Sequence, residues 1–563
     1  MSAVPLLKQL KPLTGGVFIN SHKSVTAETA YQFIPTPPQL IYHLHNKYLQ
    51  YLPKVVVGEQ IQAQQVIATA LTETQAVSSN LHAALSGQVI EITQQRIIIA
   101  VSSEPDLSPQ NYAFDDYKPA LLDHETSSHN LLEREQAALQ KIRQAGIIGL
   151  GGAGFPSASK LNRHLHTLVV NGVECEPYIT ADAALMVAEP GNILLGVIEL
   201  LKIYPQLNSI YIAIEDNKPQ SIKAIQTALA QLSLKTQYAQ CVHKIQLTAI
   251  KTVYPAGGER QLIEQLTGRA LKIRQPASDI GIACLNIASI AAIGQALAFG
   301  RPLTHRVVTL TGNALTQPGN YYLPIGTSFG VALTAAGLNS QKLHQVINGG
   351  GLMGQAVDMN KLDSIGVEAT THCIIAATAT EFAKPNERPC IQCDACVPVC
   401  PEHLLPQKLF QTNDYSLACI ECRACEVVCP SYIPLVDYFT AAKQQDRTQF
   451  IKQQRAEQAK KRYDARKQRL AQIARKQAAV AVTIQQSTAI KPNQSKQPTL
   501  RQLKTQVNKS KNLLRQAQAA YLQLQKNQAS TAESLQQAQH RVETSQFKVD
   551  QAEQALSKAS QAK

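Results

Sequence analysis

Two cysteine runs constrain this chain more than any other feature of its sequence. The first run extends from Cys390 to Cys400, and the same spacing repeats from Cys419 to Cys429. Each run reads C-x2-C-x2-C-x3-C-P, which is typical of a loop that wraps a cubane [4Fe–4S] cluster, and the fourth cysteine of each run typically ligates the other cluster. The spacing therefore predicts two clusters, one held by Cys390, Cys393, Cys396 and Cys429 and the other by Cys419, Cys422, Cys425 and Cys400.

Two other uses of these thiols fit the sequence less well. Zinc sites prefer two C-x2-C pairs held apart, whereas each run here places three cysteines at uniform spacing before a Cys-Pro. Disulfide frameworks are typical of short secreted chains, and this chain has 563 residues and no apolar signal-peptide core near its start. We therefore expect a reducing, cytoplasmic setting. Cys241, Cys284 and Cys373 lack partners at ligand spacing and are expected in the core. Cys175 could be a reactive thiol, but a small buried side chain is the better interpretation.

The length predicts several domains, and the apolar segments predict a soluble chain. The most apolar of the long uncharged stretches runs from Ile280 to Gly300 and contains Asn286, Ser289 and Gln295. Polar side chains and internal glycines disfavour a membrane span there. A buried strand followed by a helix fits the stretch better.

The net charge of +14 is concentrated in the C-terminal part of the chain. Residues 441–563 carry 24 Lys and Arg against 7 Asp and Glu, which leaves about −3 for the rest. The basic segment has almost no aromatic side chains that could stack on bases, so we expect no nucleic-acid binding. A solvated helical surface, or one that faces anionic lipid or an acidic partner, is the better interpretation.

The order of apolar runs and turns predicts a multidomain chain of the α/β plus β class. A helix over residues 128–146 precedes strands at Leu168–Asn171 and Ile210–Ile214, with a helix from Gly191 to Leu201 between them, and this alternation favours an α/β domain. Residues 40–100 alternate short apolar runs with turns and resemble the barrel-sandwich hybrid fold of lipoyl and biotinyl domains, without the carrier lysine motif. The expected domains are 1–120 (barrel-sandwich-like), 121–300 (α/β), 301–365 (β-rich), 366–440 (clusters), 441–480 (basic helix), 481–500 (linker) and 501–563 (tail).

The tail carries a weak heptad pattern. From Leu503 to Leu556, most positions that alternate by four and three residues are apolar, which predicts a coiled coil or a long hairpin. Ala, Ser, Gln and Thr at several of these positions weaken the pattern. A partly disordered Gln/Ala/Lys-rich tail remains the alternative.

Three loops carry the chemistry of the α/β domain. The first reads GLGGAGFP over residues 149–156 and lets backbone N–H groups approach a phosphate or a flat ring, with Lys160 adding positive charge. The second, VNGVECEPY over residues 170–178, places two carboxylates at the end of a strand, where α/β sheets bind ligands. The third reads YPAGGERQL over residues 254–262, where Glu259 could instead be a helix N-cap.

These three loops, in this order, resemble the NADH- and FMN-binding subunit family of respiratory NADH dehydrogenases. Within it, ECEPYITAD, a PGNYYLPIGT segment like that of soluble-ligand-binding β-grasp (SLBB) domains, and the two cysteine runs resemble the RnfC/RsxC family of Rnf/Rsx electron-transport complexes. The resemblance covers roughly residues 10–440. It implies a Rossmann-like FMN and NADH domain, a β-grasp domain and a helical two-cluster ferredoxin domain.

The resemblance also implies roles for single residues. Glu176 matches the acid on the nicotinamide side of NADH and is the expected catalytic residue, and Phe155 could stack on adenine. The expected FMN- and nucleotide-binding residues are Gly149, Gly151, Gly152, Gly154, Phe155, Lys160, Asn171, Glu174, Gly257, Gly258, Glu259 and Asn286. This chain has Val173 and Gly258 where the respiratory relatives carry acidic residues.

The resemblance implies a subunit that exchanges electrons between NAD(H), via non-covalent FMN, and the two clusters. It would be peripheral on the cytoplasmic side of the inner membrane, with the other subunits of an ion-translocating complex as partners. A redox-relay or scaffold subunit that binds no nucleotide is the main alternative. It is favoured by the absence of acidic side chains at Val173 and Gly258. A soluble diaphorase is disfavoured because the respiratory-type cysteine spacing is missing.

Overall fold

The computed structural model divides into two compact units, residues 1–451 and 452–563, which are described separately. The structure describes residues 10–27, 30–71, 77–102, 128–161, 164–235, 238–273, 275–383, 385–412, 414, 416–444, short pieces between 456 and 471, 498–526 and 532–561. Most of the predicted basic helix and nearly all of the linker lie outside these ranges.

A small β-barrel begins the first unit. Two antiparallel sheets, with strand orders β2-β8-β7-β4 and β3-β5-β6, enclose a core that includes Leu40, Ile67 and Ile99. Its strands are β2 (Gln39–His43), β3 (Tyr51–Pro53), β4 (Gln60–Ile61), β5 (Val66–Leu71), β6 (Val77–His82), β7 (Gly87–Ile92) and β8 (Arg96–Val101).

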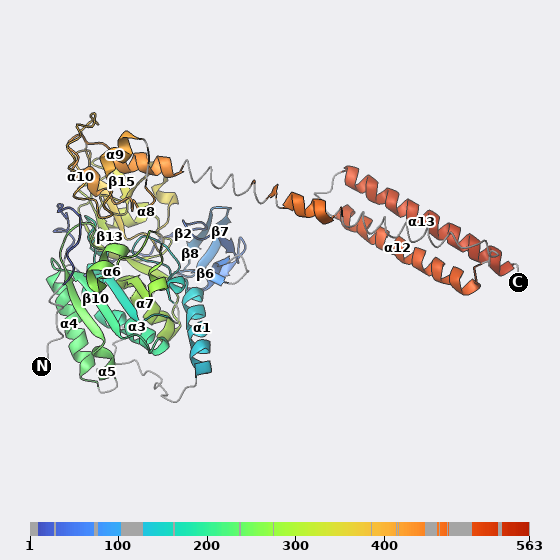
Figure 1. Cartoon of the computed structure of the whole chain (residues 1–563), viewed down its shortest axis with the longest axis horizontal. Helices are drawn as coiled ribbons and strands as arrows, with labels where there is room; N and C mark the ends of the chain where they lie inside the picture. Colours follow the sequence, from blue (N-terminus) through green and yellow to red (C-terminus); the bar gives the residue numbers. More distant parts are fainter. Residues whose placement is uncertain are drawn as a thin grey trace. The chain divides into compact units, whose positions relative to one another are not determined.

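A parallel sheet of order β11-β10-β9-β12 forms the centre of the unit, with helices packed on it (Figure 1). The strand order reverses at β9, which pairs with β10 on one side and β12 on the other, and α/β sheets bind ligands at such a switch point. The elements are α1 (Ser128–Gln144), β9 (Thr167–Gly172), α2 (Ala181–Ala188), α3 (Pro190–Ile203), β10 (Ser209–Glu215), α4 (Pro219–Ser233), α5 (Ala239–Val242), β11 (Ile245–Ile250), α6 (Glu259–Thr267), β12 (Ile282–Asn286) and α7 (Ile287–Phe299).

The predicted alternation of helices and strands in this domain is confirmed. Helix α1 ends before Gly146, whose φ of +74° is the left-handed conformation that glycine accepts at a helix end. The stretch expected to be a buried strand and helix forms β12 and α7. No single helix among the described residues is long and apolar enough to cross a membrane. Helices α2 and α3 taken together have the length and the composition of a span, but an 88° bend separates them.

A second sheet, of order β1-β14-β13-β17-β15-β16, lies beside the first. Strand β17 is central in it, between β13 and β15, so this sheet continues past residue 365, where the sequence placed a domain boundary. The elements are β1 (Gln32–Phe33), β13 (His305–Thr311), β14 (Gly319–Pro324), α8 (Phe329–Ala335), β15 (Gln345–Asn348), β16 (Gln355–Val357) and β17 (Cys373–Ala377).

The two cysteine runs follow in a compact, loop-rich domain. Its helices are short, namely α9 (Pro406–Gln411), α10 (Ala424–Val427) and a helix over 435–444. The cysteines pack against an apolar cluster that contains Ile433, Val436 and Phe439.

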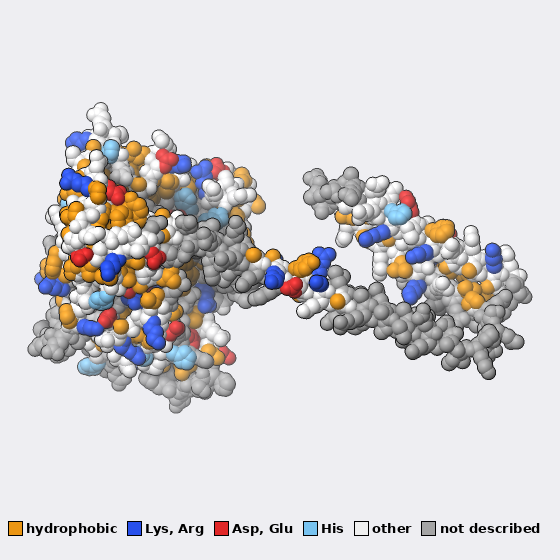
Figure 2. Space-filling view, turned by 45° about the horizontal axis from the view of Figure 1, so that its top comes forward, with side chains coloured by type: hydrophobic (Ala, Val, Ile, Leu, Met, Phe, Trp, Pro, Cys, Tyr) orange, Lys and Arg blue, Asp and Glu red, His pale blue; other side chains and the backbone are white. Residues whose placement is uncertain are grey.

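In the second unit, α12 (Leu500–Lys526) and α13 (Ala532–Gln561) pack side by side (Figure 1). The residues buried between them lie at predicted heptad positions and are Leu503, Val507, Ala538 and Val549. Lys and Arg side chains stand out along these helices (Figure 2). Helix α12 carries all of its charge as Lys and Arg, because its sequence contains no Asp or Glu.

Candidate flavin and cluster site

The first glycine loop is a tight turn between β-bridge partners Ile148 and Pro156. The N–H of Gly149 donates to the carbonyl of Phe155 at 2.8 Å and closes the turn. Gly152 has a φ of +92°, and a Cβ built there would lie 2.8 Å from the His372 ring. The loop therefore needs glycine for both its conformation and its close approach to a neighbour.

Asn171 ties the second loop to the third. Its amide nitrogen donates to the carbonyl of Gly257 at 2.9 Å, and its oxygen accepts the N–H of Val173 at 3.0 Å. A Cβ on Gly257 would lie 2.5 Å from the carbonyl oxygen of Val173. Asn171 is thus a residue that holds the two loops together at the end of β9.

The three loops enclose a cavity of about 290 Å³ at the switch point of the sheet. Most of the binding residues predicted from the sequence line it: Gly149, Gly151, Phe155, Lys160, Asn171, Glu174, Glu176, Gly257, Glu259 and Asn286. Gly152, Gly154 and Gly258 belong to the same loops without lining the cavity. The structure therefore brings together residues that lie far apart in the sequence.

Lys160 and Glu259 form an ion pair at the edge of this cavity. The Lys160 ammonium lies 2.7 Å from the Glu259 carboxylate and also donates to the carbonyl of Cys284. Burial lowers the pKa of Lys160, but Glu259 outweighs this effect and the net pKa is raised, so the ammonium is charged. Gly258, not Glu259, is the N-cap of α6, and Glu259 is its first helical residue. The N-cap alternative for Glu259 is therefore wrong.

Glu174 belongs to a buried charge network beneath the cavity. Its carboxylate lies 3.1 Å from the Lys218 ammonium, which also lies 2.9 Å from Glu215. Lys23 is the second buried cation and lies 3.8 Å from Glu215. Burial raises the pKa of Glu174, but Lys218 and Lys23 outweigh it, so the net pKa is lowered.

Glu176 faces the cavity from the same loop and is held by backbone donors. The N–H groups of Leu352 and Met353 donate to one of its oxygens at 2.8 and 2.7 Å. They belong to a glycine-rich loop between β15 and β16, and a Cβ on Gly350 would lie 1.9 Å from Glu176. Burial raises the pKa of Glu176.

Several residues around the cavity were not predicted. Asp182 is the last residue of the ECEPYITAD segment, to which no role was assigned, and it donates its backbone N–H to Glu174 at 2.8 Å. His372 lines the cavity from the segment before β17. The repeated glycines at 349–351 were a sequence signal for the loop that binds Glu176. Cys175 also lines the cavity as a partly buried side chain, and burial raises the pKa of its thiol to about 12.

The cysteine thiols gather in two groups. Burial chiefly raises the pKa of Cys419, Cys422 and Cys425, and in each case the neighbouring Cys400 thiol adds to the rise. For Cys396, the neighbouring thiols that contribute to the raised pKa are Cys393 and Cys429. Cys400 therefore lies beside the second run, and Cys429 lies beside the first.

One of the two thiol groups adjoins the flavin-type cavity. The Tyr254 hydroxyl donates to the carbonyl of Cys422 at 2.7 Å, and Tyr254 begins the third loop. Arg260 and Gln261, on α6, both donate to Glu402, two residues after Cys400, at 3.1 and 2.8 Å. The loop that encloses the cavity is thus bonded directly to the segments that carry Cys400 and Cys422.

Family models match three segments of the chain. Residues 142–295 match the Nuo51 FMN-binding domain, residues 11–104 the RnfC barrel sandwich hybrid domain, and residues 389–433 a 4Fe-4S dicluster domain. These matches confirm the predicted barrel, FMN-binding domain and cluster domain.

Curated relatives are named as the C subunit of an ion-translocating oxidoreductase complex. The protein of Edwardsiella ictaluri is 38% identical over 84% of this chain and 58% of its own length, and that of Yersinia enterocolitica is 43% identical over 62% and 51%. The protein of Salmonella arizonae is 34% identical over 85% of this chain and 70% of its own length. The chain belongs to this family.

The chain spans 51–58% of the lengths of the Yersinia and Edwardsiella proteins. The fold also has a distant likeness among solved structures. An NAD+-reducing [NiFe]-hydrogenase matches 52% of this chain and 55% of its own, at 18% identity and a TM-score of 0.37, which is too weak for any conclusion.

The residues of this RnfC-family chain fit both kinds of cofactor. A Cβ on Gly151 would lie 3.2 Å from the Asn286 amide, so glycine keeps the wall of the cavity open on that side. Lys160 offers a cation for a phosphate. The eight cysteines of the two runs supply the thiolates that two cubane clusters require. Among the described residues, no three His, Cys, Asp or Glu side chains lie close enough to hold a single ion.

Proposed function

We propose that this chain exchanges electrons between NAD(H), through a non-covalent FMN, and two [4Fe–4S] clusters. The observation that carries the proposal is the bond between Tyr254 and Cys422, because it joins the cavity of the FMN-binding domain to a cluster-binding loop. A two-electron hydride donor and one-electron centres can be coupled only through a cofactor that handles both, and a flavin supplies that chemistry.

The residues that would hold FMN are those that line the cavity from the glycine loops. Lys160 would neutralise the phosphate, with Glu259 fixing the position of its ammonium. The backbone N–H groups of the glycine loop 149–154 would lie against the cofactor. Glu174 and Asn286 would shape the end of the cavity, and Asn171 would act by holding the loops in place rather than by a bond of its own to the flavin.

The NADH side of the cavity would be the side of Glu176 and Phe155. Glu176 is held by the Leu352 and Met353 amides, so its carboxyl group has a fixed direction. Fixed carboxyl and aromatic groups are suited to orient a nicotinamide and an adenine. Glu176 would act by placing the ring and by excluding water.

The cluster ligands follow from the two thiol groups. We assign Cys419, Cys422, Cys425 and Cys400 to a first cluster, next to the cavity, and Cys390, Cys393, Cys396 and Cys429 to a second. Tyr254 and the Glu402 contacts of α6 support this order. Electrons would pass from the cavity to the first cluster and then to the second, from which a partner protein would receive them.

The second sheet and the α12–α13 pair would bind partner proteins. The second sheet, with helix α8 packed beside the β13–β14 hairpin, supports the SLBB β-grasp assignment, and the α12–α13 pair supports a short coiled coil. Partners would be the other subunits of an ion-translocating complex. The chain would be peripheral on the cytoplasmic side of the inner membrane, where the basic α12 could also face anionic lipid.

Anaerobic purification followed by NADH titration tests this function. We expect about eight irons per chain, which is two cubanes, together with one FMN. We also expect NADH to bleach first the flavin and then the cluster absorbance. Iron without flavin, and no bleaching by NADH, would support the relay subunit without nucleotide binding, which Val173, buried and lacking an acidic side chain, also favours.

Replacing Lys160 with alanine should lower flavin occupancy. The substitution removes the cation at the cavity edge and leaves Glu259 unpaired there, so FMN affinity should fall by roughly tenfold or more, given the strength of charge-assisted phosphate bonds. Flavin and iron per chain measure the effect, and iron should stay unchanged. Lys202→Ala, which removes another ion-paired lysine on α3, is the matched control. Equal flavin content in the two variants would contradict the assignment.

A further inference from the structure

Asp182 stands between two cavities. It is in the first turn of α2 and lines the cavity of the FMN-binding domain. It also lines a second cavity, of about 380 Å³, and no other described residue lines both. Asp182 is therefore the residue that the two cavities share.

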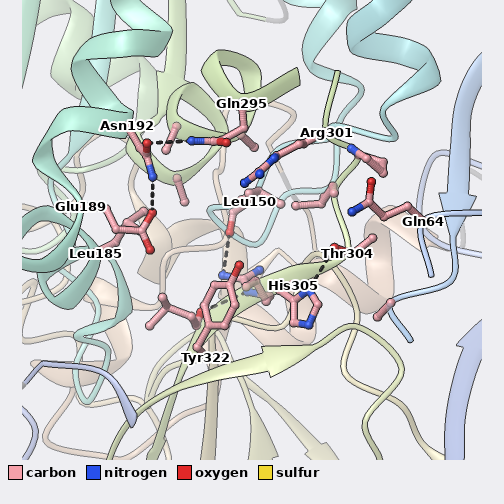
Figure 3. A pocket seen from close by; sticks show the side chains of 18 of the residues that line it. Gln64, Leu150, Leu185, Glu189, Asn192, Gln295, Arg301, Thr304, His305 and Tyr322 are labelled. Carbon is pink, nitrogen blue, oxygen red and sulfur yellow. Dashed lines mark hydrogen bonds between the residues drawn. The ribbon is translucent and has the colours of Figure 1, made fainter. Parts of the chain in front are cut away.

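The second cavity lies between the β-barrel, helices α2, α3 and α7, and strand β13. Figure 3 shows Glu189, Asn192 and Gln295 on one side and Tyr322 and His305 on another. Ala63 and Gln64 of the barrel are exposed and line it as well, so it opens to solvent there. Its polar walls distinguish it from a packing defect.

The hydrogen bonds in this cavity leave places for water. Glu189 can only accept, so Asn192 must donate to it, at 2.7 Å, and Gln295 must in turn donate to the Asn192 oxygen, also at 2.7 Å. This order fixes the Gln295 amide and leaves its oxygen without a partner in the described part of the chain. The His305 Nε2 atom is also buried without a hydrogen-bond partner among the described residues. Buried polar atoms of this kind are commonly bridged by ordered water.

Charged groups surround Asp182 from several elements. Desolvation and the charge of Glu174 raise its pKa to about 7, against weaker opposing effects of the Asn286 amide, Arg306 and Lys218. Arg306 comes from β13, Lys218 from the start of α4, and Asn286 from the end of β12. The Asn286 amide donates to the Asp182 carboxyl group at 2.6 Å. His372 is kept neutral, because burial and then Arg306 lower its pKa.

We propose that Asp182 is the proton carrier of the flavin site and that the second cavity connects it to solvent. The inference rests on the proposed function. A hydride from NADH brings two electrons and one proton, and neutral reduced flavin requires one proton more, which Asp182 gives up. When two single electrons leave for the clusters, two protons leave as well. Asp182 would take these two protons one after the other and pass each of them to water in the second cavity before it is protonated again from that water.

Protonation kinetics of the bound flavin test the carrier, because a carrier changes the rate of proton transfer and not the number of protons bound at equilibrium. After a pH jump between pH 6 and 8, the reduced flavin of Asp182→Asn should re-equilibrate at least about tenfold more slowly than that of wild type, given what a positioned acid contributes to proton transfer. Formate, a small weak acid, should restore the rate, which a merely structural defect would not allow. A wild-type rate in D182N overturns the inference. Wild-type chain that binds no flavin would instead contradict the proposed function.

Ala292→Leu tests the route without touching Asp182. Ala292, on α7, lines the second cavity but not the first, so leucine should fill part of it and leave the flavin potential unchanged. After the same pH jump, the bound flavin should re-equilibrate several-fold more slowly than in wild type. Ala335→Leu, on α8 and outside both cavities, is the matched control. Equal rates in both variants overturn the second cavity as the route, whether or not D182N folds.

Discussion

Replacing Cys390 and Cys429 together with alanine is expected to remove one cluster, whereas replacing Cys390 and Cys400 is expected to remove both. The reason is the crossed grouping of the thiols, since Cys429 lies beside the first run and Cys400 beside the second. The first pair would thus be ligands of one cubane, and the second pair would be divided between two. Iron per chain should be about four in the first variant and close to none in the second.

Ligation within each run predicts the opposite result. In that arrangement, Cys390 and Cys400 would share one cubane, so their joint replacement would leave about four irons, and the Cys390/Cys429 variant would lose nearly all. Cys241→Ala is the control, because Cys241 is half-buried on α5, away from both runs, and should leave iron content unchanged. Low-temperature electron paramagnetic resonance of the reduced chains would identify the remaining cluster.

Much of the local structure could be predicted because it depends on short-range rules. Glycines mark the turn at 149–154 and the end of α1, and the apolar runs mark β9, β10 and α3. The cavity residues were found by motif, since three loops of characteristic sequence meet at one switch point of the sheet. In the tail, the residues buried between α12 and α13 are at heptad positions.

The sequence did not reveal which residues that lie far apart along the chain contact one another in the fold. Lys23 and Lys218 are separated by the β-barrel and the first half of the FMN-binding domain, and neither lies in a motif, yet both neutralise Glu174. Tyr254 follows an ordinary strand end, and only the folded chain shows its bond to Cys422. Asn171 was expected at the cofactor and does line the cavity, but its hydrogen bonds to the Gly257 and Val173 backbone were not expected. Such pairings depend on the tertiary structure rather than on local spacing.

Replacing Lys218 with methionine should destabilise the FMN-binding domain severely. Lys218 is 7% exposed and lies against Glu174 and against Glu215, which is fully buried. Without Lys218, two carboxylates share the single remaining cation, Lys23. Removing one partner of a buried ion pair costs about 3–5 kcal/mol. Urea unfolding of the full chain at pH 7, followed by tyrosine fluorescence and circular dichroism, measures the loss in the transition of this domain.

A lysine on the same helix provides the matched control. Lys223 is exposed on α4, so Lys223→Met should change stability by no more than about 0.5 kcal/mol. A Lys218→Met chain whose unfolding free energy stays within about 1 kcal/mol of that of Lys223→Met would show that the network is not structural. Adding Glu174→Gln to Lys218→Met should recover part of the loss, since one unpaired carboxylate is then removed.

The pH dependence of the Lys218→Met effect follows from the signs of the pKa shifts. In the folded chain, the pKa of Glu174 is lowered by Lys218 and Lys23, so its contribution to stability is present above its unfolded pKa of about 4.3 and is lost as pH falls through the folded value. The pKa of Lys218 is raised by the two carboxylates, so its contribution is complete below its unfolded pKa of about 10.4. The difference in unfolding free energy between wild type and Lys218→Met should therefore be largest between about pH 5 and 9. It should shrink as pH falls through the lowered folded pKa of Glu174, where that carboxylate becomes protonated and no longer needs the buried ammonium.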